Sequence, residues 1–169
     1  MTTRSAEPLD PTRSLVEAFL TNERVNQVLL ELLDPGIWRA YPPCSKRRNI
    51  ATTFAHIHNV RVMRLKASGK GIALPERLDR GEVTPGEASG ALASSAKAVV
   101  ALIEAAARNG GRIAAFPPGI VLLVVGAVSH EAHHRGQITH WARELGSPIT
   151  AEDALRIWEW DKLWKEVRG

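Results

Sequence analysis

Cysteine is almost absent from this sequence of 169 residues. The single Cys44 excludes a disulfide framework within the chain and a cysteine-rich zinc site. Long apolar runs are also missing, since the longest one, residues 120–128, is too short to span a bilayer. Residues 1–10 have no apolar core of the signal-peptide type. We therefore expect a soluble protein of the cytoplasm with no membrane partner.

Alternation of apolar and polar residues, the pattern of a half-buried strand, is also missing over any long stretch. Apolar residues instead recur at helical spacing, and capping or turn residues separate the periodic segments. The helices expected in this way cover about residues 14–33, 50–67, 84–108, 120–145 and 151–167. We predict an all-α fold in one domain, a four-helix bundle with an additional C-terminal helix, in which residues 1–12 are flexible.

Basic residues outnumber acidic ones by 22 to 18, and the excess is concentrated in one stretch. Residues 46–80 hold nine Lys or Arg against two Asp or Glu. Such a stretch can attract nucleic acid or an acidic substrate. It has almost no aromatic residues that could stack on bases, so a solvated basic surface is the simpler interpretation.

Histidine is the residue type whose distribution is unusual. Five of the six histidines fall in two clusters, which are His56 with His58, and His130 with His133 and His134. On a helix, the spacing of four residues places His130 and His134 on one stripe, together with Gln137, in a geometry suited to two ligands of one metal ion. The order of residues does not match the H-E-x-x-H pattern of zinc proteases. His56 and His58 lie about 200° apart around a helix, and periodicity does not choose between them. Hydrogen-bonded core histidines are the alternative to a metal site.

Two segments resemble the signature segments of the DinB-like family, a group of small four-helix metalloproteins. They are residues 54–61, FAHIHNVR, and residues 129–138, SHEAHHRGQI. The first helix, with AFL at 18–20 followed by Asn22 and Asn26, is similar to the opening segment of the family, so that the resemblance covers nearly the whole chain.

The resemblance implies three metal ligands. It assigns one to the second helix, His56, and two to the fourth helix, His130 and His134, while His58 and His133 become neighbours of the ligands. Three neutral imidazoles leave open positions on a divalent ion, which is the layout of a catalytic metal site. We expect one such ion per chain, zinc or nickel first, with iron or manganese as alternatives because histidine nitrogens discriminate poorly. Candidates for the groups around the ligands or the pocket are Gln137, Asn22, Asn26 and Asn59.

The function implied by this resemblance is that of a metal-dependent enzyme, a thiol S-transferase or a hydrolase, and no catalytic side chain is predicted. Its partner would be a low-molecular-weight thiol or another small molecule, which the basic stretch 46–80 could attract if it is anionic. A lone Cys44 without a catalytic motif is more often incidental, so thiol chemistry would come from a cosubstrate. The alternative is a non-catalytic metal-binding protein of a stress response, and a nucleic-acid-binding protein ranks last. A homodimer is expected by resemblance alone.

Overall fold

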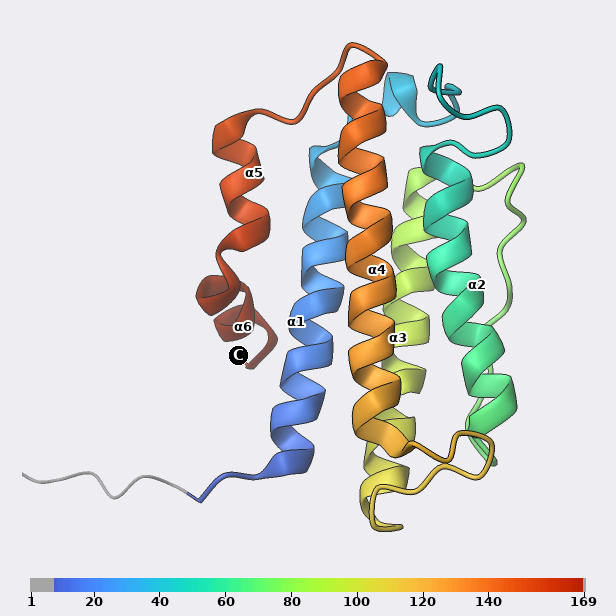
Figure 1. Cartoon of the computed structure of the whole chain (residues 1–169), viewed down its shortest axis with the longest axis vertical. Helices are drawn as coiled ribbons and strands as arrows, with labels where there is room; N and C mark the ends of the chain where they lie inside the picture. The colour runs from blue at the N-terminus through green and yellow to red at the C-terminus, as the bar shows by residue number, and fades with distance from the viewer. Residues whose placement is uncertain (1–7, 169) are drawn as a thin grey trace, which may run out of the picture.

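The computed structural model describes residues 8–168, which form six α-helices and one short 3₁₀ helix (Figure 1). The α-helices are α1 (Pro11–Leu32), α2 (Ile50–Ser68), α3 (Pro85–Ala107), α4 (Gly119–Glu144), α5 (Ala151–Trp158) and α6 (Trp160–Arg168). The 3₁₀ helix η1 (Pro35–Ile37) follows α1. No strand occurs in the described part of the chain, so the prediction of an all-α bundle is confirmed.

The four long helices form a bundle with one long crossover. α1 and α4 run in one direction, and α2 and α3 run in the other (Figure 1). The connection of residues 69–84 returns along the length of the bundle, so that α2 and α3 lie parallel. α1 and α2 each pack against both α3 and α4. A crossover of this kind is one of the standard topologies of four-helix bundles.

Capping side chains fix where the helices begin. The carboxylate of Asp10 accepts hydrogen bonds from the backbone of the first turn of α1, and Pro11 occupies the first helical position, so α1 begins earlier than predicted. Thr84 and Glu87 form the predicted capping box at the start of α3. The segment 1–12, predicted to be flexible, lies mainly outside the described residues, and its last two residues already belong to α1.

The bundle core consists of two apolar clusters that are separated along the helices by polar side chains. One cluster, near η1, includes Trp38, Phe54 and Trp141. The other, at the opposite end, includes Phe19 and Leu102. A group of buried polar residues lies between the two apolar clusters. We call it the polar layer, and it consists of Asn22, Glu23, Asn26, Arg61, Glu131 and Arg135. A polar layer inside a bundle requires that its members satisfy one another.

The prediction of a single helix over residues 151–167 is wrong, because the chain forms two short helices there. The break is at Glu159, whose backbone leaves the helical region. It separates α5 from α6 and lets Leu163 of α6 pack against Val25 and Val28 of α1. The indole of Trp164 in α6 donates a hydrogen bond to Glu17 at 2.7 Å. α5 and α6 therefore form an arm that is attached to the outside of α1 (Figure 1).

α3 is the one described helix that is long and apolar enough to cross a membrane by length and composition. In the bundle its apolar residues pack against α1, α2 and α4. This is the environment of a helix that contributes one face to the core of a bundle.

Candidate metal centre

The structure brings three of the six histidines together between α2 and α4. His56 comes from α2, and His130 and His134 come from α4. The ring centroids lie 5.2 Å apart for His56 and His130, 4.8 Å for His56 and His134, and 4.5 Å for His130 and His134. One nitrogen of each ring lies within 4.8 Å of the others, so the three residues could hold one metal ion.

Helix packing resolves the choice between His56 and His58 that the sequence left open. His56 is half-buried and faces the two histidines of α4. His58 is fully buried elsewhere on α2, where its Nε2 lies 2.8 Å from the carbonyl oxygen of Glu76 in the crossover connection. His133 contacts the ring of His134 but is exposed, outside the group of three.

The distances within the histidine cluster suit nitrogen ligands. Nε2 of His134 lies 3.1 Å from Nε2 of His130. Two zinc–nitrogen bonds of about 2.0–2.1 Å at a tetrahedral angle would place their nitrogens about 3.3 Å apart. Nδ1 of His134 lies 2.7 Å from Oε1 of Gln137, which accepts a hydrogen bond from the N–H group of Nδ1. The neutral ring then keeps its lone pair on Nε2, as a metal ligand requires.

Arg80 forms a hydrogen bond to His56 that competes with metal binding by this ring. Nη2 of Arg80 lies 3.2 Å from Nδ1 of His56 and donates to its lone pair. A neutral imidazole has one lone pair and one N–H group, so a metal ion can be bound by His56 only after this hydrogen bond is released.

The surroundings keep the three imidazoles neutral. Burial lowers the pKa of His56 to about 4, with smaller contributions from repulsion by His134, His130, Arg80 and Arg48. Burial also lowers the pKa of His130 and of His134. Neutral rings at physiological pH are the protonation state that metal binding needs.

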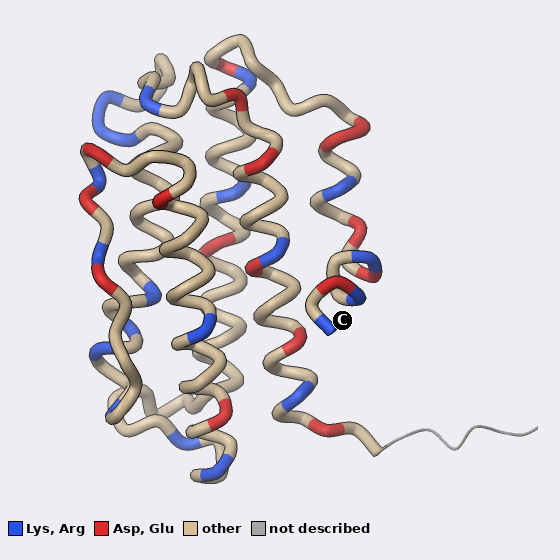
Figure 2. The backbone as a smooth tube through the Cα atoms, turned by 180° about the vertical axis from the view of Figure 1, so that it is seen from behind, with Lys and Arg blue, Asp and Glu red and all other residues tan. Residues whose placement is uncertain are grey.

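Arginines from the basic stretch 46–80 surround the histidine cluster. Arg48 and Arg80 lower the pKa of His56, and Arg64 lowers that of His130, which places their charges near the rings. The remaining basic residues of the stretch lie in the loop before α2, on α2 and in the crossover, and acidic residues lie between them only in the crossover (Figure 2). The prediction that the basic residues of this stretch form a solvated surface is wrong for Arg61, because Arg61 is buried in the polar layer.

Of the four residues predicted to lie around the ligands, one touches a ligand. Gln137 bonds to His134. Asn59 is hydrogen-bonded at both ends of its amide to the backbone of Leu78, and so fastens the crossover to α2. Asn22 and Asn26 belong to the polar layer, where their amides bond to neighbouring charged side chains and to none of the three rings.

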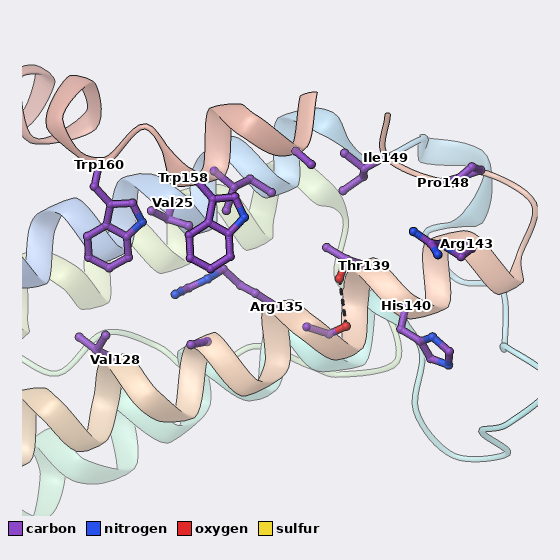
Figure 3. Close-up of a pocket in the computed structure, with 14 residues that line it drawn as sticks. Val25, Val128, Arg135, Thr139, His140, Arg143, Pro148, Ile149, Trp158 and Trp160 are labelled. Carbon is purple, nitrogen blue, oxygen red and sulfur yellow. Dashed lines mark hydrogen bonds between the residues drawn. The ribbon is translucent and has the colours of Figure 1, made fainter. Parts of the chain in front are cut away.

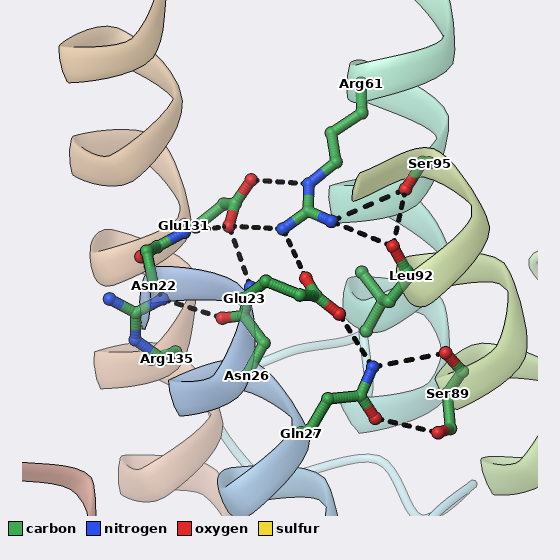
Figure 4. Close-up of polar contacts among 10 residues, drawn as sticks. All are labelled: Asn22, Glu23, Asn26, Gln27, Arg61, Ser89, Leu92, Ser95, Glu131 and Arg135. Carbon is green, nitrogen blue, oxygen red and sulfur yellow. Dashed lines mark hydrogen bonds and ion pairs between the residues drawn. The ribbon is translucent and has the colours of Figure 1, made fainter. Parts of the chain in front are cut away.

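The polar layer is the part of this region that sequence reasoning missed. Arg61 donates to both oxygens of Glu131 at 2.7 Å and pairs with Glu23 at 2.7 Å (Figure 4). Asn22 and Asn26 donate to Glu131 at 2.6 and 2.8 Å. Their amide oxygens accept from Nη1 of Arg135. The one available signal was the pair of asparagines at i and i+4 on an otherwise apolar stripe of the first helix.

The charges of the polar layer compensate one another. Two arginines face two glutamates, so the formal charge of the layer is zero. Burial raises the pKa of Glu131, but the charge and the hydrogen bonds of Arg61, with those from the asparagines, outweigh it and hold this pKa below its ordinary value. The layer therefore works as an ionic network that connects α1, α2 and α4 beside the histidines of α4.

Cys44 lies apart from the three histidines, in an exposed loop beside His140 and Glu144. A hydrogen bond and repulsion from Glu144, together with burial, raise the pKa of its thiol. A raised pKa favours the thiol over the reactive thiolate, so this cysteine lacks the environment of a nucleophile.

Comparison with known proteins agrees with the residue pattern. A protein-family model described as the DinB family matches residues 120–166, which include α4, α5 and most of α6. The matched segment contains His130, His134 and Gln137. No curated protein and no solved structure matches the chain.

Proposed function

Because residues 120–166 match a model of the DinB family, we propose that the chain binds one divalent metal ion through His56, His130 and His134 and serves as a metal-dependent enzyme. The observation that carries this proposal is the meeting of three neutral imidazoles from two helices, with two of their Nε2 atoms 3.1 Å apart. Zinc or nickel is the first choice for such nitrogen ligands, and iron or manganese also fits.

The proposed chemistry follows from the number of protein ligands. An ion held by three nitrogens keeps open positions and lowers the pKa of a bound water or thiol. The chain itself supplies orientation, since Gln137 fixes the ring of His134. Arg48, Arg64 and Arg80 supply positive charge around the cluster, which would attract an anionic cosubstrate. We therefore favour a thiol S-transferase that uses a low-molecular-weight anionic thiol, with a hydrolase as the other reaction class.

The alternative is a metal-binding protein of a stress response without turnover. It uses the same three histidines, so metal content alone does not separate the two functions. A nucleic-acid-binding function ranks below both, since Arg61 is buried and the basic residues of the crossover are interspersed with acidic ones. A cytoplasmic location and a homodimer remain part of the proposal.

Elemental analysis of protein purified without a histidine tag tests the metal site. We expect about one ion per chain in the parent protein, and the loss of this ion in His56→Ala and in His134→Ala. His133→Ala is the matched control, since His133 lies in the same turn of α4 but outside the group of three. Unchanged metal content in His56→Ala and His134→Ala would contradict the proposed site.

Turnover distinguishes the enzyme from the metal-binding alternative. The metal-loaded protein is incubated with an electrophile and a panel of low-molecular-weight thiols, and separately with ester and amide substrates. We expect conjugation with an anionic thiol that disappears in His134→Ala and persists in His133→Ala. Stoichiometric metal without turnover in either assay would overturn the enzyme and support the alternative.

A further inference from the structure

A cavity of about 540 Å³ lies between α4 and the arm formed by α5 and α6 (Figure 3). At 100° per residue, Thr139 in its wall lies about 180° around α4 from His130. The cavity is therefore on the opposite face of α4 from the histidine cluster. It is a second, separate candidate site.

Most of the cavity wall is apolar. Val25 of α1, Ile149 before α5, and Ile157 and Trp158 of α5 contribute to it. Trp158 exposes 74% of its surface, an unusual fraction for so large an apolar ring. Cavities of a few hundred Å³ with apolar walls and a few polar groups are the usual sites of small molecules.

Two arginines give the polar side of the cavity its positive charge. Arg135, Thr139 and Arg143 follow one another at intervals of four residues on α4. Among the described residues that line the cavity, His140 is a further basic group and none is acidic.

Arg135 is the most informative of these groups. Only 8% of its surface is exposed, and its side chain extends from α4 into the space between α4 and the arm (Figure 3). Both of its hydrogen bonds leave from Nη1, to the amide oxygens of Asn22 and Asn26. Nε and Nη2 have no hydrogen-bond partner among the described residues. Burial lowers the pKa of Arg135, and Glu131 only partly offsets this effect.

We propose that this cavity binds a small carboxylate that carries an apolar body. The carboxylate accepts hydrogen bonds from the free N–H groups of Arg135, and Arg143 adds a second positive charge. The apolar body covers Trp158 and Ile157. A second copy of the chain fits this face less well, because a symmetric contact would bring the basic side chains of both copies together.

Binding of decanoate tests the proposal. Metal-free protein is used so that the outcome does not depend on the proposed metal function. The quenching of tryptophan fluorescence and calorimetry give the affinity. We expect decanoate to bind at least about tenfold more tightly than decanol, since a hydrogen-bonded carboxylate contributes more than a hydroxyl. Equal affinities would overturn the carboxylate assignment.

A cavity-filling variant shows where the probe binds. A Cβ added at Gly136, in the cavity wall, meets no atom within 4 Å, so Gly136→Leu can fold and fill the cavity. We expect it to weaken decanoate binding at least about tenfold, because the side chain occupies the space of several methylene groups. Gly90→Leu on α3, where the added Cβ also meets open space, is the matched control and should bind like the parent.

The charge of the cavity is tested without disturbing the polar layer. Arg143→Ala should weaken decanoate binding severalfold and leave decanol unchanged, because Arg143 is exposed and contributes charge rather than packing. Unchanged decanoate binding in Gly136→Leu would overturn the proposal. So would a dimer, seen by sedimentation, that Gly136→Leu abolishes, since a second copy would then be the occupant.

Discussion

The polar layer and the histidine cluster are adjacent on α4, where Glu131 follows His130 and Arg135 follows His134, yet their polar atoms have different partners. In the polar layer, the charges of Arg61 and Glu131 are buried and bonded to each other. In the histidine cluster, Nε2 of His130 lies 3.1 Å from Nε2 of His134, and neither atom has a charged partner among the described residues. Buried ion pairs are typical of a structural network, and imidazole nitrogens that converge on one point are typical of a metal-binding site. The comparison separates residues that hold the bundle together from residues that are free to bind.

The largest difference between the two regions is expected in their response to a fall in pH. We expect the metal-loaded protein to retain zinc as the pH falls from 7 to about 5, and to bind it at least about 100-fold more weakly near pH 4. The reason is that the lowered pKa values of the three histidines, about 4 for His56, delay protonation. The lowered pKa of Glu131 keeps the polar layer ionised over this range, so helicity should persist.

A zinc-indicator competition assay and circular dichroism at each pH measure both quantities on one sample. Complete release of zinc already at pH 6, or unfolding that coincides with release, would contradict the comparison.

Removal of one charge from the polar layer should have the next largest effect. Glu131→Ala leaves Arg61 without its bidentate partner, and breaking a buried ion pair in this way costs about 3–5 kcal/mol. Denaturant unfolding measures the loss of stability. Glu152→Ala, at an exposed position of α5, is the control and should change the stability by no more than about 0.5 kcal/mol. A loss below about 1 kcal/mol in Glu131→Ala would show that the pairing of Glu131 with Arg61 contributes little to stability.

A change beside one ligand should weaken metal binding and leave the fold intact. Gln137→Leu removes the acceptor for Nδ1 of His134, and the loss of such a partner typically weakens metal affinity about 10–100-fold. Competition with a zinc chelator measures the affinity. Gln137→Glu keeps an acceptor at this position and should restore the affinity. If both variants bind zinc like the parent, Gln137 does not orient the ring.

The smallest effect is expected from an arginine beside the cluster. Arg80→Ala removes the hydrogen bond that occupies Nδ1 of His56 and a positive charge near the site. Zinc should therefore bind about 2–10-fold more tightly, within the range of a partly exposed charge interaction. Arg77→Ala in the same connection is the control and should bind like the parent. Weaker binding in Arg80→Ala would show that Arg80 supports the site rather than competes with it.

Local signals in the sequence were sufficient for much of the fold. Capping residues such as Thr84 and Glu87 predicted where α3 begins, and the spacing of His130 and His134 predicted that they share a stripe. The break at Glu159 was missed because both segments around it have helical periodicity, and the contacts of α6 with α1 were not visible in the sequence.

The polar layer could not be predicted for a related physical reason. Glu131 meets Arg61 across 70 residues of sequence and Asn22 across 109, so the partner of each buried group is determined by helix packing. The same holds for the choice between His56 and His58, since only the position of α4 beside α2 distinguishes the two faces.

The bond between Asn22 and Arg135 also has a consequence for the time course of synthesis. The two residues are 113 positions apart. At about 5–20 residues per second, a ribosome needs roughly 6–23 s to add the second after the first. During this interval the buried amides of α1 have no partner from α4. The hydrogen bonds of α1 to α4 in the polar layer therefore form only after the chain has been synthesised as far as Arg135.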